Sequence, residues 1–224
     1  MATIAEIGMD TAQLAEVSAR LEQAGATETI RWTAGRFGSA VALACSFQDC
    51  VIVDLAVKVD PGLEVVFLDT GFHFPETLEF VELVRARYQL NLTVTHPSAD
   101  ADPWPCGTVE CCQRRKVWPL SQALEGKAAW LTGLKRSDAA TRSSTPVVAW
   151  DEARQMVKVN PLAAWTDDDI ADYISAHRLP VHPLLARGYL SIGCAPTTRP
   201  VQPGEDPRAG RWSGSDKTEC GLHS

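Results

Sequence analysis

The sequence has little that would suit a nucleic-acid or membrane protein. Its 224 residues carry a formal net charge of −7, whereas a surface that binds nucleic acid needs excess lysine and arginine to neutralise phosphates. No apolar run approaches the roughly 20 residues that a membrane-spanning helix requires. We therefore expect neither a nucleic acid nor a membrane among the partners of this chain.

The chain also lacks the signs of export. Its opening MATIAEIGMD has neither the basic start nor the uninterrupted apolar core of a secretory signal. Its seven cysteines are an odd number, and the reducing cytoplasm disfavours disulfides. We therefore expect a cytoplasmic protein whose cysteines ligate a metal or act in catalysis.

The first expected strand-to-helix loop lacks the glycines and the lysine of a Walker A motif, which disfavours ordinary ATPase chemistry. The loop reads Cys45-Ser46-Phe47-Gln48-Asp49. Backbone N–H groups at such a helix start, together with a serine hydroxyl, can bind phosphate oxygens. A phosphate site and a plain helix cap are both open on this evidence.

Short apolar runs alternate with helical patterns along the chain. Strands are expected over residues 40–44, 63–68, 92–95 and 128–131, with helices over 51–57, from Pro75 to about Tyr88, and from near Cys111. This order predicts the α/β class with a mainly parallel, doubly wound sheet. Ligands of such sheets bind beyond the carboxyl ends of the strands, which here are loops 46–49, 69–74 and 133–142.

The flanks of this region carry local signals of their own. Apolar residues repeat at helical spacing behind Asp10, and Thr166 begins a capping box for a further helix. Residues 147–150 and 156–159 are expected to pair as a hairpin. We divide the chain into an α/β domain over residues 1–185 and a C-terminal tail over residues 186–224.

Three cysteines are candidate metal ligands. Cys111 and Cys112 are adjacent, and their side chains diverge on a helix, so an ordinary disulfide between them is disfavoured. Both thiolates can still reach one multi-iron cluster, whose irons lie on different corners. Cys194 follows about eighty residues later, which makes three thiolates where such a cluster normally has four. Buried structural cysteines are the alternative.

Basic residues gather near these cysteines and in the expected ligand-binding loops. Guanidinium groups suit the oxygens of sulfate and phosphate, so this pattern favours an anionic ligand, with a solvated charged face as the alternative. The cations are Arg114, Arg115, Lys116, Lys135, Arg136, Arg142, Arg199, Arg208 and Arg211.

Cys220 stands four residues before the end of the sequence. A thiol on a flexible end can approach a site, react, and then withdraw to meet a partner. The alternative is that Cys220 has no function, as is usual for a single cysteine near a chain end.

Taken together, these residues resemble the assimilatory adenylyl-sulfate (APS) reductases of the APS/PAPS reductase family. The resemblance covers Ala44 to Ser224 and rests on FLDTGFHFPET, CCQRRKVWPL, TGLKRSDAATR, VKVNPLAAWT, HPLLARGYLSIGCAP, GEDPRAGRW and ECGLH. It implies an adenine nucleotide α-hydrolase-like fold and the reduction of adenosine 5′-phosphosulfate to sulfite and AMP in sulfate assimilation. It also implies that Cys220 forms an S-sulfocysteine, which thioredoxin then reduces.

The resemblance assigns further residues to the site. The tail would carry Cys220 and one cluster ligand, while the domain over residues 1–185 would bind the nucleotide. Phosphosulfate is expected to contact Lys116, Arg208 and Arg211. The nucleotide is expected to contact Ser46, Phe47, Asp69, Gly71, Gly133 and Arg142.

In this family, a tandem cysteine pair with a later Cys-x-x-Cys accompanies a [4Fe–4S] cluster and a preference for the substrate without a 3′-phosphate. The sequence keeps Cys111, Cys112 and Cys194 but has Thr197 at the fourth position. Because a hydroxyl is a poor iron ligand, we expect an incomplete or labile cluster. Three alternatives are open. Cys106 could replace the missing ligand, another unusual group could bind the fourth iron, or the site could hold no cluster.

Two other functions are open on the sequence. One is reduction of the 3′-phosphorylated substrate, and the other is a non-catalytic iron–sulfur or nucleotide-binding role. An adenylate-forming enzyme that uses ATP on a related fold is disfavoured, because no glycine-rich pyrophosphate loop surrounds Ser46. The oligomeric state is not determined by the sequence.

Overall fold

The structure is a computed structural model that describes residues 8–212, 217 and 219–222. The start of the opening segment and His223 of the closing motif lie outside the described residues. Within the described part, no helix is both long and apolar enough to cross a membrane.

In the described part of the chain, six strands form one sheet in the order β3-β2-β1-β4-β6-β5. Neighbouring strands are parallel except for the antiparallel pair of β5 and β6. This arrangement confirms the predicted α/β class, the mainly parallel sheet and the hairpin. The strands are β1 (Val41–Ala44), β2 (Glu64–Leu68), β3 (Asn91–Thr95), β4 (Ala129–Thr132), β5 (Val148–Asp151) and β6 (Met156–Val159).

The helices begin and end close to the positions that local signals predict. Asp10 and Thr166 both form capping boxes, and Pro75 occupies the first turn of its helix. The second helix begins at Ala26, directly after Gly25, which ends the first. The helices are α1 (Thr11–Ala24), α2 (Ala26–Phe37), α3 (Val51–Val59), α4 (Pro75–Tyr88), α5 (Val109–Cys112), α6 (Trp118–Ala123) and α7 (Asp167–His177).

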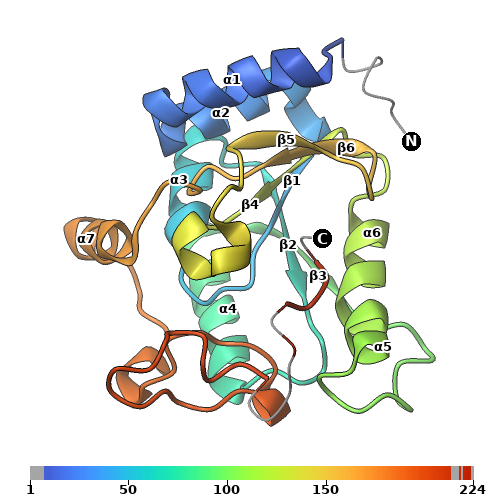
Figure 1. Cartoon of the computed structure of the whole chain (residues 1–224), viewed down its shortest axis with the longest axis vertical. Helices are drawn as coiled ribbons and strands as arrows, with labels where there is room; N and C mark the ends of the chain where they lie inside the picture. Colours follow the sequence, from blue (N-terminus) through green and yellow to red (C-terminus); the bar gives the residue numbers. More distant parts are fainter. Residues whose placement is uncertain (1–7, 213–216, 218, 223–224) are drawn as a thin grey trace.

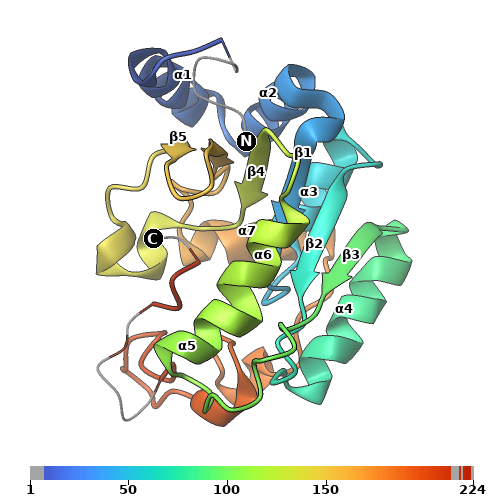
Figure 2. The ribbon, with the colours of Figure 1, turned by 90° about the vertical axis from the view of Figure 1, so that its right-hand side faces the viewer.

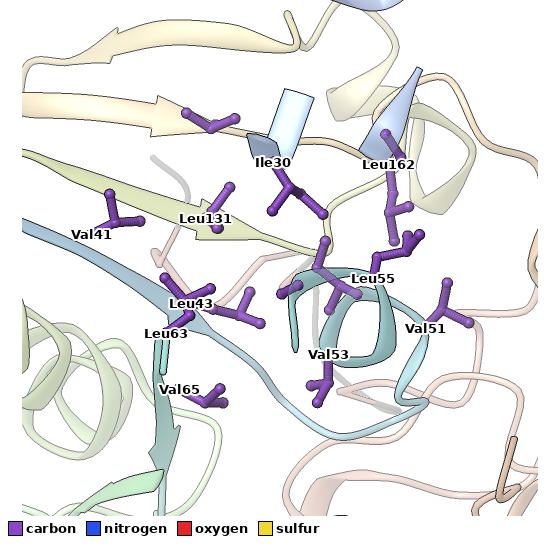
Figure 3. Packing of buried hydrophobic residues seen from close by; sticks show 14 of the residues in the cluster. Ile30, Val41, Leu43, Val51, Val53, Leu55, Leu63, Val65, Leu131 and Leu162 are labelled. Carbon is purple, nitrogen blue, oxygen red and sulfur yellow. The ribbon is translucent and has the colours of Figure 1, made fainter. Parts of the chain in front are cut away.

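The central strands bury both faces because helices cover the sheet on two sides. Along β1, Leu43 packs into a core with α2 and α3, whereas Ala42 packs into a second core under α6. Figure 1 shows α3 and α4 on one side of the sheet and α6 on the other. Figure 3 shows Val53 and Leu55 on α3 beside the strands that carry Leu43 and Leu131, and all four belong to one core cluster.

The segment after α7 returns beneath the carboxyl ends of the parallel strands. Figures 1 and 2 show this orange-to-red part of the chain across the end toward which β2 and β3 point. Leu222, near the end of the described chain, packs against the second core. The tail therefore meets the edge of the sheet at which ligands of such folds bind.

Candidate active site

A cavity of about 600 Å³ lies at the carboxyl ends of the strands, and this volume suits a small-molecule ligand. All three loops that were expected to bind the ligand contribute to its walls, together with residues of the tail. Predicted site residues that line the cavity are Ser46, Lys116, Gly133, Arg142, Cys194, Arg208, Arg211 and Cys220.

The loop after β1 reaches the cavity, while phosphate binding by this loop stays a prediction. Asp49 accepts a hydrogen bond from the N–H of Val51 at 2.9 Å and so holds the turn that leads into α3, whose N-cap residue is Cys50. Ser46 faces the cavity. Phe47 is fully buried, with its ring 5.6 Å from that of Phe67, and its φ of 55° turns the loop. Its side chain therefore shapes the loop from the core, and a nucleotide contact by Phe47 stays a prediction.

The turn after β2 is held by its own side chains. Asp69 Oδ1 accepts from the N–H of Gly71 at 2.9 Å, and Gly71 has a φ of +70°. A side chain at position 71 would also meet Arg115, whose guanidinium donates to the Thr70 carbonyl at 3.0 Å. Thr70 and His73 line the cavity from this turn. Nucleotide contacts by Asp69 and Gly71 also stay predictions.

Lys116 lies on a π-helical turn, Gln113–Val117, between α5 and α6. π turns are frequent at functional sites, and no sequence signal predicts this one. Although burial opposes its charge, the cysteines Cys194, Cys220 and Cys112 raise the pKa of Lys116. The buried ammonium is therefore positive, and it lines the cavity together with Cys194 and Cys220.

Arg211 is positioned by the tail. Its guanidinium donates to Ser191 Oγ at 3.3 Å and to the Ile192 carbonyl at 3.2 Å, and lies 4.6 Å from the ring centre of Trp212. It also passes directly over Gly193, where an added Cβ would lie 2.4 Å from Cζ. Glycine at position 193 therefore makes room for this cation.

Glu219 joins the tail to the cations of the cavity, and the sequence reasoning did not identify it. Its carboxylate accepts from Arg142 Nε at 2.8 Å and Nη2 at 2.7 Å, and from Arg208 at 3.5 Å. Burial raises the pKa of Glu219, but the bond from Arg142 outweighs it, and the net pKa lies below the usual value. In the sequence, the signal that could have identified Glu219 is its position directly before Cys220.

Cys220 is half-buried and lines the cavity beside these cations. Its thiol interacts electrostatically with Lys116, Arg142 and Arg211, so it lies near all three cations. Cys45 also lines the cavity, but burial raises its pKa, so that thiol stays protonated. Cys220 is therefore the better candidate nucleophile of the two.

A second group of thiols adjoins the cavity, and Cys194 of this group also lines it. Cys111, Cys112 and Cys194 are buried, and all seven cysteines of the chain are free thiols. Lys217 Nζ donates to Cys112 Sγ at 3.1 Å, and Cys194 Sγ lies 3.7 Å from Thr70 Oγ1. Among the described residues, no three Cys, His, Asp or Glu side chains converge on a single-ion site. A multi-iron cluster does not require such convergence, because each thiolate binds a different iron.

Known proteins are similar to this chain both in sequence and in architecture. The phosphoadenosine phosphosulfate reductase domain family matches residues 39–200. Adenosine 5′-phosphosulfate reductase of Mycolicibacterium smegmatis is 47% identical, over 92% of this chain and 91% of that protein. The crystal structure of phosphoadenylyl-sulfate reductase from Candida auris has a TM-score of 0.75 at 26% identity and covers 85% of this chain and 98% of that one.

A more distant likeness concerns the fold alone. FMN adenylyltransferase from Candida glabrata has a TM-score of 0.60 at 18% identity, over 81% of this chain and 66% of that one. These likenesses confirm the expected adenine nucleotide α-hydrolase-like fold and the resemblance drawn from the motifs. This chain belongs to the phosphoadenosine phosphosulfate reductase family.

Proposed function

We propose that this chain is an oxidoreductase that reduces adenosine 5′-phosphosulfate to sulfite and AMP in sulfate assimilation. The observation that carries this proposal is the position of Cys220 in a nucleotide-sized cavity among Lys116, Arg142, Arg208 and Arg211. The relative from Mycolicibacterium smegmatis bears the name of this activity. A non-catalytic binding protein would have no need of a thiol at this place.

In the first step, the Cys220 thiolate attacks the sulfur atom of the sulfate group. A sulfur–sulfur bond forms, the bond from sulfur to the bridging oxygen of the phosphate breaks, and AMP leaves with that electron pair. The product on the enzyme is S-sulfocysteine. Lys116, Arg208 and Arg211 would neutralise the phosphate and sulfuryl oxygens as charge moves onto them.

In the second step, a thioredoxin thiolate attacks Cys220 Sγ, and sulfite leaves with the electrons of the sulfur–sulfur bond. The second thioredoxin thiol then resolves the mixed disulfide and returns Cys220 as a thiol. One dithiol is oxidised for each sulfate group reduced, so the electrons balance. This exchange requires residues 186–224 to act as a tail that can expose Cys220, and a reducing compartment such as the cytoplasm.

The charges in the cavity favour the substrate without a 3′-phosphate. A second charged group lies at the ends of β1 and β4, where Lys135 Nζ is 2.6 Å from Asp138 and 3.2 Å from Asp167. Asp49 is buried beside them. Because the one lysine is already shared by two carboxylates, an additional phosphate here would meet repulsion. Reduction of the 3′-phosphorylated substrate is the second candidate, supported by the likeness to the Candida auris structure.

The substrate preference is tested by measuring sulfite release from each nucleotide with thioredoxin as the reductant. We expect kcat/KM for adenosine 5′-phosphosulfate to exceed that for the 3′-phosphorylated compound by at least about tenfold, since one unneutralised charge costs more than about 1.4 kcal/mol in such a site. The reverse preference would establish the second candidate. No sulfite from either substrate would refute the proposed activity.

The group of buried thiols fits an iron–sulfur cluster, because soft thiolate is the ligand that such clusters favour. We propose that Cys111, Cys112 and Cys194 bind a [4Fe–4S] cluster. When bound, the cluster would supply negative charge and rigidity behind the cavity wall. Lys116, which contacts Cys194, would be held at the cavity by this charge.

The contact between Gly193 and Arg211 predicts a selective effect of Gly193→Ala. The new Cβ would displace the flexible guanidinium, so substrate affinity should fall by about tenfold or more while the melting temperature changes little. Calorimetric titration and a thermal melt measure the two quantities. Gly35→Ala is the matched control, because open space surrounds a Cβ there. Unchanged affinity in Gly193→Ala would show that the position of Arg211 does not matter.

A further inference from the structure

Cys106 lies against the position at which the family pattern expects a fourth cysteine. Its Sγ is 3.7 Å from Thr197 Oγ1, although the two residues are 91 positions apart in sequence. The thiol of Cys106 also lies close enough to the thiols of Cys194 and Cys111 to interact with both electrostatically. Cys106, from another segment of the chain, therefore places a sulfur atom next to residue 197, where Thr197 itself provides none.

The loop that carries Cys106 is built to approach residue 197. Thr108 donates from its hydroxyl to the Pro105 carbonyl at 3.0 Å and accepts from the N–H of Cys111 at 3.1 Å. This turn leads directly into α5. Gly107 has a φ of +97°, and a Cβ on it would lie 3.1 Å from Thr197 Cγ2. Glycine thus permits both the reversal of the chain and the contact with Thr197.

A lysine of the tail ties the same loop to a cluster ligand. Lys217 Nζ donates to the carbonyls of Gly107 and Thr108, at 3.0 and 3.2 Å, and to Cys112 Sγ at 3.1 Å. The loop is consequently fixed relative to Cys112 and not only to Thr197. An ammonium at this position would also compensate the negative charge of several thiolates.

The hydroxyl of Thr197 has a different role. It donates to the carbonyl of Cys194 at 3.4 Å and so belongs to the hydrogen bonds of the turn 195–197. Binding to iron would require this hydroxyl to lose its proton and would place a hard oxygen where the metal favours sulfur. The residue therefore supports the turn and leaves the ligand position to its neighbour.

We propose that Cys106 supplies the fourth thiolate of the cluster in place of residue 197. This inference rests on the proposed cluster. Cys106 would bind iron as its thiol proton passes to solvent, with no change in its oxidation state. Three thiolates would come from residues 106–112 and the fourth from Cys194. The cluster would then have four thiolate ligands. The sequence, with Thr197 at the family's fourth position, predicts an incomplete or labile cluster.

The experiment measures iron and acid-labile sulfide in anaerobically purified full-length protein. We expect about four irons per chain in the wild type, about three or fewer in Cys106→Ser, and about four again in Cys106→Ser/Thr197→Cys. Cys50→Ser is the control, because Cys50 donates to the Pro180 carbonyl outside this group and serine can keep that bond. Four irons and unchanged visible absorption in Cys106→Ser would overturn the inference.

A second measurement uses the wild type and does not depend on the folding of a variant. Native holoprotein is alkylated anaerobically, and the modified cysteines are identified by mass spectrometry before and after iron is chelated. We expect Cys106 to be protected with Cys111, Cys112 and Cys194 and to react with them after chelation. Alkylation of Cys106 at full iron occupancy would overturn the inference.

The two proposals fail in different ways. The wild type could contain no iron and still form the sulfite adduct on Cys220. That result would overturn the role of Cys106 and leave the proposed reduction intact. A full cluster with Cys106 protected, but no adduct and no sulfite, would support the ligand assignment and refute the proposed activity.

Discussion

A Cys220→Ser variant is expected to release no detectable sulfite while it keeps its affinity for the nucleotide. The hydroxyl is a far weaker nucleophile than a thiolate, so turnover should fall by at least about 10³-fold. Binding should survive, because the cations that line the cavity are unaltered. Sulfite release with thioredoxin and calorimetric binding of AMP measure the two effects.

The same experiment has a direct chemical readout in the wild type. Incubation with adenosine 5′-phosphosulfate and no reductant should leave the mass of a sulfite group on the Cys220 peptide. Cys50→Ser is the matched control and should be fully active, because burial raises the pKa of Cys50 to about 12 and keeps that thiol protonated. An adduct on Cys45 or any other cysteine would contradict the assignment of the nucleophile.

Removal of the cavity cations is expected to have the second-largest effect. Lys116→Ala, Arg208→Ala and Arg211→Ala should each weaken substrate binding by roughly 1.5–3 kcal/mol, which is about 10- to 150-fold in Kd. The reason is that each change removes a charge-assisted hydrogen bond to phosphate or sulfate. Binding should also weaken as salt is added, and the salt dependence should be smaller in each variant.

Two neighbouring cations serve as controls for these changes. Arg114 lies on the same turn as Lys116 but pairs with Asp100, and Arg199 pairs with Glu205 on the tail. Neither lines the cavity. Their alanine variants should bind the substrate as the wild type does. Unaltered dissociation constants in all three cavity variants would place the anion site elsewhere.

Glu219 suggests how the tail and the substrate are related. Its carboxylate occupies Arg142 and approaches Arg208, which are groups that an anionic substrate would also attract. Arg142 is further shared with Asp138 at 3.2 Å. Arg142 is thus paired with two carboxylates within the described chain, and Cys220 is held at the cavity by the residue before it.

The sequence by itself determined most of the architecture. The capping boxes at Asp10 and Thr166, the proline that begins α4, and the alternation of apolar runs all act between residues a few positions apart. Such local signals fix where a helix or strand forms, and the order of the elements then favours a mainly parallel sheet. The motifs added the family, because their order and spacing along the chain are also read directly from the sequence.

Only the tertiary structure decided which distant residues meet. Glu219 reaches Arg142 across 77 positions, and Cys106 reaches Thr197 across 91. Phe47, which the motif placed near the nucleotide, has its side chain in the core instead of in the cavity wall. These outcomes depend on how the loops and the tail pack against the edge of the sheet, and on a positive φ at residues 47 and 107. No short-range pattern encodes such contacts, because their energy comes from atoms that become neighbours only after the chain has folded.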